Sequence, residues 1–394
     1  MSTYARNAIV LGLLVAVGPF AIDMYIPALP AIAADLGATT AATQATLMSY
    51  FVGFGVFQLV FGPVSDAVGR KAPLYVGLTL FAAASLGCAV THSVEWLIAL
   101  RVLQGIGASA AMVIPRAVIR DMYTGIEATR LMSFVMLVFS VSPILAPLFG
   151  SALIEAFGWH SVFVAVAVAA GLAFVLIATL LPETRPAGER VPVNAANLVA
   201  GFARLLGDAR FIGLTFIGGF GLSGFFVFLA TSSFLYMGHF GLTPFEYSLA
   251  FSVNAIGFIG TSQFAAWLGG RFGIARVVMV AVSVCAGFAL LLLAVTAAGS
   301  DSLAVLMAIL FVSNAALGLV IPATMVLALE EHGPIAGTAS ALGGTLHMVT
   351  GAIAIVLVSQ VFDGTALPMV AAIALCATGA FAVSLVTLRS RRGS

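Results

Sequence analysis

The 394-residue sequence is 62% hydrophobic and only 8% charged, with a formal net charge of +1. Soluble domains carry about 25% charged residues, so this composition excludes them and indicates an all-α integral membrane protein. The apolar runs are too continuous for a membrane β-barrel, whose strands alternate over about ten residues. The sequence contains no basic patch of the kind that would indicate a nucleic-acid partner. The three cysteines each lie within an apolar run, so we expect them to be small buried side chains rather than a disulfide framework. They are Cys88, Cys285 and Cys376.

Twelve apolar segments are each long enough to cross a bilayer as a helix. The first lacks a small-residue cleavage site, so we expect a retained span rather than a signal peptide. A polar connection after Pro182 separates two groups of six, which predicts two pseudo-symmetric six-helix bundles at 1–182 and 210–394, joined by a cytoplasmic linker at 183–209. The expected spans lie near 7–29, 42–61, 73–91, 96–116, 131–153, 161–182, 210–236, 246–268, 274–298, 303–328, 335–361 and 366–388.

The basic residues predict the orientation. All 16 Lys and Arg residues except Arg101 fall before the first span, after the second and eighth, between the fourth and fifth, along the linker or at the C-terminus. The connections on the opposite side carry none. Because Lys and Arg accumulate on the cytoplasmic side, an even number of spans with this bias places both termini in the cytoplasm.

Asp23 is one of two charged residues embedded in the expected spans, and it lies in A-I-D-M-Y-I-P-A-L-P. Pro19, Pro27 and Pro30 surround it, which predicts an irregular helix whose unpaired carbonyls line a cavity. A carboxylate in a low-dielectric site favours its neutral form, which suits it to take up and release a proton. The alternative is a helix-end aspartate at the outer headgroup level, satisfied by water or a backbone amide.

Arg101 is the second embedded charge, in R-V-L-Q-G-I-G-A-S-A. Arginine stays charged, so it suits a fixed counter-charge or a conformational latch rather than a proton carrier. The alternative is a side chain that snorkels to the outer surface. Polar and aromatic residues in the spans are candidates for substrate binding, with helix packing as the alternative for the amides and the histidine. They are Tyr25, Tyr50, Gln104, Phe225, Asn254 and His347.

The stretch Q-L-V-F-G-P-V-S-D-A-V-G-R-K at 58–71 is a short charged turn between the second and third spans. It resembles the signature loop of the major facilitator superfamily, with Ala67 in place of the loop's first arginine. The resemblance implies a conformational latch in which Asp66 meets a basic residue of the fourth helix, Arg116 or Arg120, and the start of the eleventh. An ordinary stop-transfer turn is the alternative. The implied latch comprises Gly62, Asp66, Gly69, Arg70, Lys71, Arg116 and Arg120.

Five further motifs resemble the Bcr/CflA-type drug:proton antiporters of that superfamily. They are D-M-Y-I-P-A-L-P at 23–30, R-x-x-Q-G-x-G-A-S at 101–109, P-R-A-V-I-R-D at 115–121, S-P-I-L-A-P-L-F-G at 142–150 and L-P-E-T at 181–184. The resemblance makes Asp23 and Arg101 the proton-coupling pair, with Asp23 the only acid of the first helix. It also makes Pro143, Pro147 and Gly150 the fifth-helix antiporter motif, for which a kink without functional weight is the alternative.

These features together predict a monomeric transporter of the bacterial inner membrane. We expect it to exchange protons for small amphipathic drugs, such as phenicol- or bicyclomycin-like compounds, by alternating access. The sequence shows no Ser–His–acid set, no metal-ligand cluster and no phosphate-binding loop, so we expect neither an enzyme, nor a cofactor, nor a bound metal. The alternatives are an exporter of an endogenous metabolite, such as an amino-acid derivative, and a membrane sensor that transports nothing.

Overall fold

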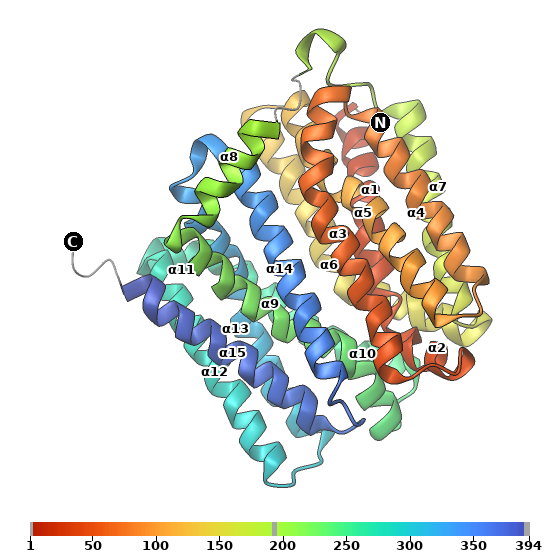
Figure 1. Ribbon diagram of the computed structural model, residues 1–394, viewed down its shortest axis with the longest axis vertical. Helices are drawn as coiled ribbons and strands as arrows, with labels where there is room; N and C mark the ends of the chain where they lie inside the picture. Colours follow the sequence, from red (N-terminus) through yellow and green to blue (C-terminus); the bar gives the residue numbers. More distant parts are fainter. Residues whose placement is uncertain (1–2, 191–194, 390–394) are drawn as a thin grey trace. The chain divides into compact units, whose positions relative to one another are not determined.

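A computed structural model of the protein describes residues 3–190 and 195–389 (Figure 1). This part of the chain contains helices and no strand. Twelve of its helical segments are long and apolar enough to cross a membrane, the first at Tyr4–Asp35 and the last at Ala366–Leu388. The predicted all-α fold with twelve spans is therefore confirmed.

Residue contacts divide the chain into two compact units, Met1–Asn194 and Ala195–Ser394. The predicted domain boundaries at 182 and 210 remain expectations. The predicted bundles and linker also contain residues 1–2, 191–194 and 390–394, which lie outside the described residues. The N-terminal unit contains α1 (Thr3–Asp23), η1 (Ile26–Ala28), α2 (Leu29–Asp35), α3 (Thr40–Val68), α4 (Lys71–Val90), α5 (Val94–Met122), α6 (Gly125–Phe157), α7 (His160–Leu180) and η2 (Ala187–Glu189).

The C-terminal unit begins with a short helix, α8, that the sequence did not predict within the linker, and α8 packs against α14 and α9 (Figure 1). The elements of this unit are α8 (Ala195–Leu206), α9 (Ala209–Ser233), η3 (Phe234–His239), α10 (Pro244–Ser262), α11 (Ala265–Phe272), α12 (Ile274–Ala297), α13 (Leu303–Glu330), η4 (Gly333–Ile335), α14 (Ala336–Ser359) and α15 (Ala366–Arg389).

The first span is broken where the prolines predict it. Helix α1 ends at Asp23, a 3-10 turn follows at Ile26–Ala28, and α2 resumes the direction. Pro27 and Pro30 have no backbone N–H and cannot continue the α-helical hydrogen-bond ladder. The break places the Asp23 carboxylate at a helix end inside the N-terminal unit.

Glycines let α3 and α5 approach closely. A Cβ on Gly105 of α5 would lie 2.9 Å from Phe54 N of α3, and a Cβ on Gly53 would lie 3.3 Å from Ile106 N. Small residues at a helix interface permit this kind of backbone contact in membranes. The contact brings Arg101, one turn before Gly105, against the start of α3. Elsewhere, Cys88 and Cys285 are buried and Cys376 is partly buried, and all three are free thiols, as the sequence predicts.

Candidate functional site

Arg101 is the centre of a polar cluster inside the N-terminal unit. Its side chain is 0% exposed, so the alternative of snorkelling to the surface is wrong. The guanidinium carbon lies 4.3 Å from the ring centroid of Tyr25 and 4.4 Å from that of Tyr50. A guanidinium within about 6 Å of an aromatic face is attracted by the ring quadrupole, more strongly when both are out of water. Two of the six substrate-binding candidates therefore hold the buried cation.

Hydrogen bonds fix the guanidinium in its plane. Arg101 Nη1 donates to Gln104 Oε1 at 2.5 Å and to Ala21 O at 3.3 Å, and Nε donates to Thr46 O at 3.4 Å. Gln104 in turn donates from Nε2 to Ser85 Oγ at 2.7 Å. Arg101 Nη2 is buried without a hydrogen-bond partner. The cluster thus retains one unused donor on a permanently charged group.

The two tyrosines are themselves anchored through their hydroxyl groups. Tyr50 Oη donates to Gly18 O of α1 at 3.0 Å. Tyr25 Oη shares a short hydrogen bond with Thr46 Oγ1, whose own hydrogen goes to Thr43 O. A backbone carbonyl of α1 therefore anchors the ring of Tyr50 and a side-chain hydroxyl of α3 anchors that of Tyr25, which keeps both stacked on Arg101.

Asp23 is 7% exposed at the end of α1, and its Oδ2 accepts a hydrogen bond from Ser142 Oγ of α6 at 3.0 Å. The alternative expected from the sequence is a helix-end aspartate at the outer headgroup level with water or a backbone amide as its partner. Asp23 does end α1, but its partner here is a side-chain hydroxyl, and its role in proton coupling stays a prediction. Among the described residues, no carboxylate lies within 4.0 Å of the Arg101 guanidinium. The acid and the cation are thus held in one unit without direct contact, and the acid can exchange a proton without first breaking an ion pair.

The fifth-helix motif packs directly onto the segment that follows Asp23. Pro143 and Pro147 lie inside α6, and Gly150 faces the backbone of Met24. A Cβ on Gly150 would overlap Met24 O and lie 2.8 Å from Met24 Cα. The glycine therefore allows α6 to approach the broken first span closely enough for Ser142, eight residues earlier, to reach Asp23.

The signature loop contains a charge network whose partners differ from the expectation. Asp66 pairs with Arg70, with 2.7 Å between Oδ1 and Nη1, and not with Arg116 or Arg120. Arg120 is exposed and Arg116 is partly buried. The physical reason is local: α3 ends at Val68 and the chain turns at Gly69, whose φ is +99°, and this turn brings Arg70, four residues after Asp66, into contact with it.

Arg70 connects that aspartate to the fourth span. Its side chain is 3% exposed, and it donates from Nε to Asp121 Oδ2 at 2.8 Å and from Nη1 to Ser65 Oγ at 2.8 Å. Lys71 donates from Nζ to Leu181 O at 2.8 Å. Gly69 adopts a φ of +99°, which favours glycine, whereas a Cβ on Gly62 would make only ordinary contact with Val113.

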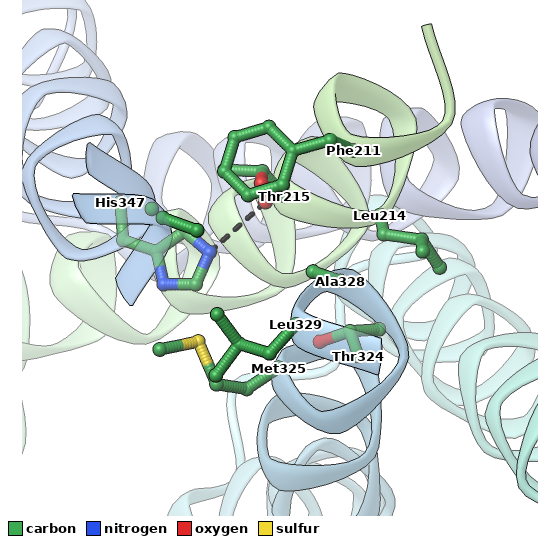
Figure 2. A pocket seen from close by; sticks show the side chains of 10 residues that line it. Phe211, Leu214, Thr215, Thr324, Met325, Ala328, Leu329 and His347 are labelled. Atoms are coloured by element: carbon green, nitrogen blue, oxygen red, sulfur yellow. Dashed lines mark hydrogen bonds between the residues drawn. The ribbon is translucent and has the colours of Figure 1, made fainter. Parts of the chain in front are cut away.

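The remaining candidates belong to the C-terminal unit. His347 of α14 lines a small pocket with residues of α9 and α13, and Figure 2 shows its hydrogen bond to α9. His347 Nε2 lies 3.0 Å from Thr215 O, and because a carbonyl can only accept, Nε2 carries the hydrogen and Nδ1 is the free acceptor of the neutral ring. The pocket is small: its volume of about 10 Å³ is room for a single water molecule.

The two remaining candidates make contacts between helices. Asn314 donates from Nδ2 to Asn254 Oδ1 at 3.3 Å, which links α13 to α10. Phe225 of α9 stacks on Phe258 of α10, with 5.7 Å between ring centroids. For Asn254 the packing alternative that the sequence left open is present in the structure, and a role in substrate binding stays a prediction for both residues.

The model of the family described as "Major Facilitator Superfamily" matches residues 11–355 of this sequence. The chain belongs to the Major Facilitator Superfamily. The Uncharacterized MFS-type transporter YdgK of Bacillus subtilis is 36% identical over 364 residues, which cover 92% of this chain and 90% of the relative. The Bicyclomycin resistance protein homolog of Haemophilus influenzae is 30% identical, with 93% and 92% covered. The Chloramphenicol resistance protein of Pseudomonas aeruginosa is 29% identical, with 94% and 88% covered.

A solved structure agrees with the fold. The crystal structure of nucleoside transporter NupG (D323A mutant) superposes with a TM-score of 0.76 at 14% identity, covering 98% of this chain and 99% of that one. These comparisons confirm the predicted superfamily and its Bcr/CflA type, whose members are transporters rather than enzymes. The chain is thus a multi-pass bacterial membrane protein of a transporter family.

Sequence reasoning missed the hydrogen-bonding residues around the embedded charges. Ser142, Thr46 and Ser85 orient Asp23, Tyr25 and Gln104, yet each reads as an ordinary small polar residue of a span. Ser142 had a signal, because it opens the S-P-I-L-A-P-L-F-G motif. Thr46 and Ser85 had none, since only the packing of α3 and α4 against α5 brings them to the cluster.

Proposed function

We propose that this Major Facilitator Superfamily member exports small amphipathic drugs, of the phenicol or bicyclomycin type, in exchange for protons. The observation that carries the proposal is the buried Asp23 carboxylate, held by Ser142 in the same unit as the fully buried Arg101 but not paired with it. The resistance proteins among its relatives support drugs as the cargo. The protein works as a monomer in the bacterial inner membrane, with both termini in the cytoplasm.

Protonation of Asp23 changes the net charge of the site that it forms with Arg101. With Asp23 ionised, the Asp23–Arg101 pair of charges sums to zero, and with Asp23 protonated the cluster carries one positive charge. A proton at this site shifts the balance between conformations only by the difference in its affinity for Asp23 between them. Ser142 Oγ donates to ionised Asp23, and its lone pairs accept a hydrogen bond from protonated Asp23.

The chemical class of the cargo is inferred from the small number of carboxylates in the first span. Asp23 is the only acid of α1, and the aromatic rings of Tyr25 and Tyr50 stack on Arg101 in the same unit. A site of this kind suits neutral or weakly polar compounds that bury an apolar body and hydrogen-bond at a few points. The unused donor at Arg101 Nη2 is one such point for a carbonyl or hydroxyl oxygen of the drug.

The test is drug-triggered proton release from inverted membrane vesicles energised by respiration. A pH dye inside the vesicles reports the response to chloramphenicol, florfenicol, bicyclomycin and a lipophilic cation. We expect a response to one or more of the neutral drugs that Asp23→Asn abolishes. Asp35→Asn is the matched control, because Asp35 ends α2 in the same unit, accepts from Trp159 Nε1 at 3.0 Å and is exposed.

Two results would overturn the proposal. Wild-type proton release by Asp23→Asn would remove Asp23 from the coupling step. No response to any drug, in vesicles that contain folded wild-type protein, would remove drugs as the cargo and make an exported metabolite the next hypothesis.

A further inference from the structure

The head of the linker, which we define as Glu183, Thr184 and Arg185, lies against the signature loop. Glu183 Oε1 accepts the backbone N–H of Arg70 at 2.8 Å, and Oε2 accepts that of Lys71 at 3.0 Å. Helix α4 begins at Lys71, so these donors belong to a helix start, where N–H groups have no partner within the helix. A carboxylate there also meets the positive end of the helix dipole. Glu183 therefore caps α4 from 112 residues away along the chain.

Lys71 in turn contacts the end of α7, the helix that precedes the linker. Its Nζ donates to Leu181 O at 2.8 Å and to Ala178 O at 3.4 Å. These carbonyls lie in the last turn of α7 and just after it, where C=O groups lack partners and a cation is favoured. Two helix ends are thus capped reciprocally, α4 by Glu183 and α7 by Lys71.

Gly69 leaves room for the Glu183 carboxylate at the start of α4. A Cβ at Gly69 would lie 2.8 Å from Glu183 Oε2, so any other residue would push the carboxylate off the helix start. The corresponding turn of the C-terminal unit has Gly273 with a φ of +86° and nothing within 4 Å of its Cβ position. The two turns thus share a positive φ at the glycine, and of the two only the N-terminal turn has a carboxylate against it.

The linker head also reaches the acids of the signature-loop network. Thr184 Oγ1 donates to Asp121 Oδ2 at 3.1 Å. Arg185 Nη1 lies 3.9 Å from Asp121 Oδ1 and 4.0 Å from Asp66 Oδ1. These are the two carboxylates that Arg70 binds, so the linker head and the loop arginine share the same partners.

We propose that Glu183 is a positioning residue of the signature loop, which docks the linker head on α4 and thereby holds Arg70 against Asp66 and Asp121. The consequence is that the linker sets how readily this network rearranges during transport. Glu183 acts through Arg70 and not on the cargo, so its loss changes the rate of export and not the affinity for the drug. The docking itself stands on contacts within the N-terminal unit, and only its effect on export rests on the proposed function.

The first arm of the test is amide hydrogen exchange of the full-length protein in lipid nanodiscs. The two carboxylate oxygens of Glu183 accept from three backbone N–H groups, those of Arg70, Lys71 and Arg185. Glu183→Gln leaves one acceptor oxygen for them, so we expect exchange at Arg70 and Lys71 to become about fivefold faster. Glu246→Gln is the matched control, since Glu246 belongs to the capping box of α10 in the other unit. Faster exchange throughout α4 and α5, rather than at these two amides, would show general destabilisation and overturn the inference. Unchanged exchange at both amides would overturn it as well.

The second arm measures drug efflux and drug binding. We expect Glu183→Gln to lower the maximal efflux rate about two- to fivefold while the Kd for the drug stays within twofold of wild type, and Glu246→Gln to change neither. A raised Kd with an unchanged rate would overturn the positioning role. If wild-type protein moves none of the drugs, the proposed function fails, and the exchange experiment still decides whether Glu183 docks the linker.

Discussion

Gly150→Ala is the substitution that tests the geometry of the candidate site most directly. It adds a single methyl group at the point where α6 touches the broken first span. The methyl carbon would lie 2.8 Å from Met24 Cα and 3.0 Å from Met24 C, and it would overlap Met24 O. All three neighbours are backbone atoms, so no side chain can move aside, and α6 itself must shift.

The size of that shift follows from the distances. Ordinary contact begins at 3.4 Å, so the separation from Met24 Cα must grow by roughly 0.6 Å, the difference between 3.4 and 2.8 Å. The same displacement stretches the Ser142–Asp23 hydrogen bond from 3.0 to roughly 3.6 Å, which is beyond hydrogen-bond range. Overpacking of this kind costs about 1–3 kcal/mol. In a unit of about 190 residues this corresponds to a Tm lowered by about 2–12 °C.

The assay combines thermal unfolding of purified protein with drug-triggered proton release. We expect Gly150→Ala to lower the Tm and to reduce proton release at least tenfold, because Asp23 loses its hydrogen-bond donor. Gly171→Ala is the matched control on α7 of the same unit, where nothing lies within 4 Å of the added methyl. It should leave the Tm unchanged or raise it, since alanine favours the helix. Wild-type Tm and proton release in Gly150→Ala would refute the argument.

The other predictions concern the cation and the loop. Arg101→Lys keeps the charge but loses the planar group between Tyr25 and Tyr50, so we expect a loss of about 2–4 kcal/mol in thermal unfolding, against no change for the exposed Arg120→Lys. Tyr50→Phe removes one hydrogen bond to Gly18 O and should cost about 1 kcal/mol in the same assay, while a cost above that of Arg101→Lys would contradict the stacking argument. Burial raises the pKa of Glu183, but its backbone N–H donors, those of Arg70 and Lys71 together with those of Arg185 and Thr184, outweigh burial and hold the pKa below its usual 4.5. Its stabilising effect is therefore complete above pH 4.5 and lost as the pH falls through the lowered value, and Glu183→Gln should remove that part of the pH dependence of the Tm.

The fold was predictable because the bilayer leaves few choices. A backbone in hydrocarbon must satisfy its own hydrogen bonds, so twelve apolar runs imply twelve helices, and Pro27 and Pro30 mark the place where one of them breaks. Helix α8 was not predictable in the same way. Its 12 residues, Ala195–Leu206, are mostly apolar but too few to cross a bilayer, and they pack against α14 and α9.

The site was predictable in its charged members and not in their partners. An ionisable residue within a span is costly, so Asp23 and Arg101 stand out from the sequence alone. The tyrosines that hold Arg101 come from other helices, and their stacking depends on the α3–α5 contact that Gly53 and Gly105 permit. Asp66 shows the same limit, because its cation is Arg70, four residues away on its own chain segment, rather than the expected arginine of the fourth span. The role of the loop as a conformational latch stays a prediction.

The placement of both embedded charges in one unit constrains the proton step. Alternating access in this superfamily rocks one bundle against the other, and the distances within each bundle change little. Asp23 and Arg101 both belong to Met1–Asn194 and are fixed there by Ser142, Gln104 and two tyrosines. The attraction of Arg101 for ionised Asp23 is then the same in every conformation and cannot by itself drive proton uptake on one side and release on the other. The difference in proton affinity must come from what faces Asp23 from outside its bundle, either water or the drug. Under the proposed function, a drug that displaces water from Asp23 favours its neutral form, so proton and drug are coupled through desolvation of a single carboxylate rather than through a switching ion pair.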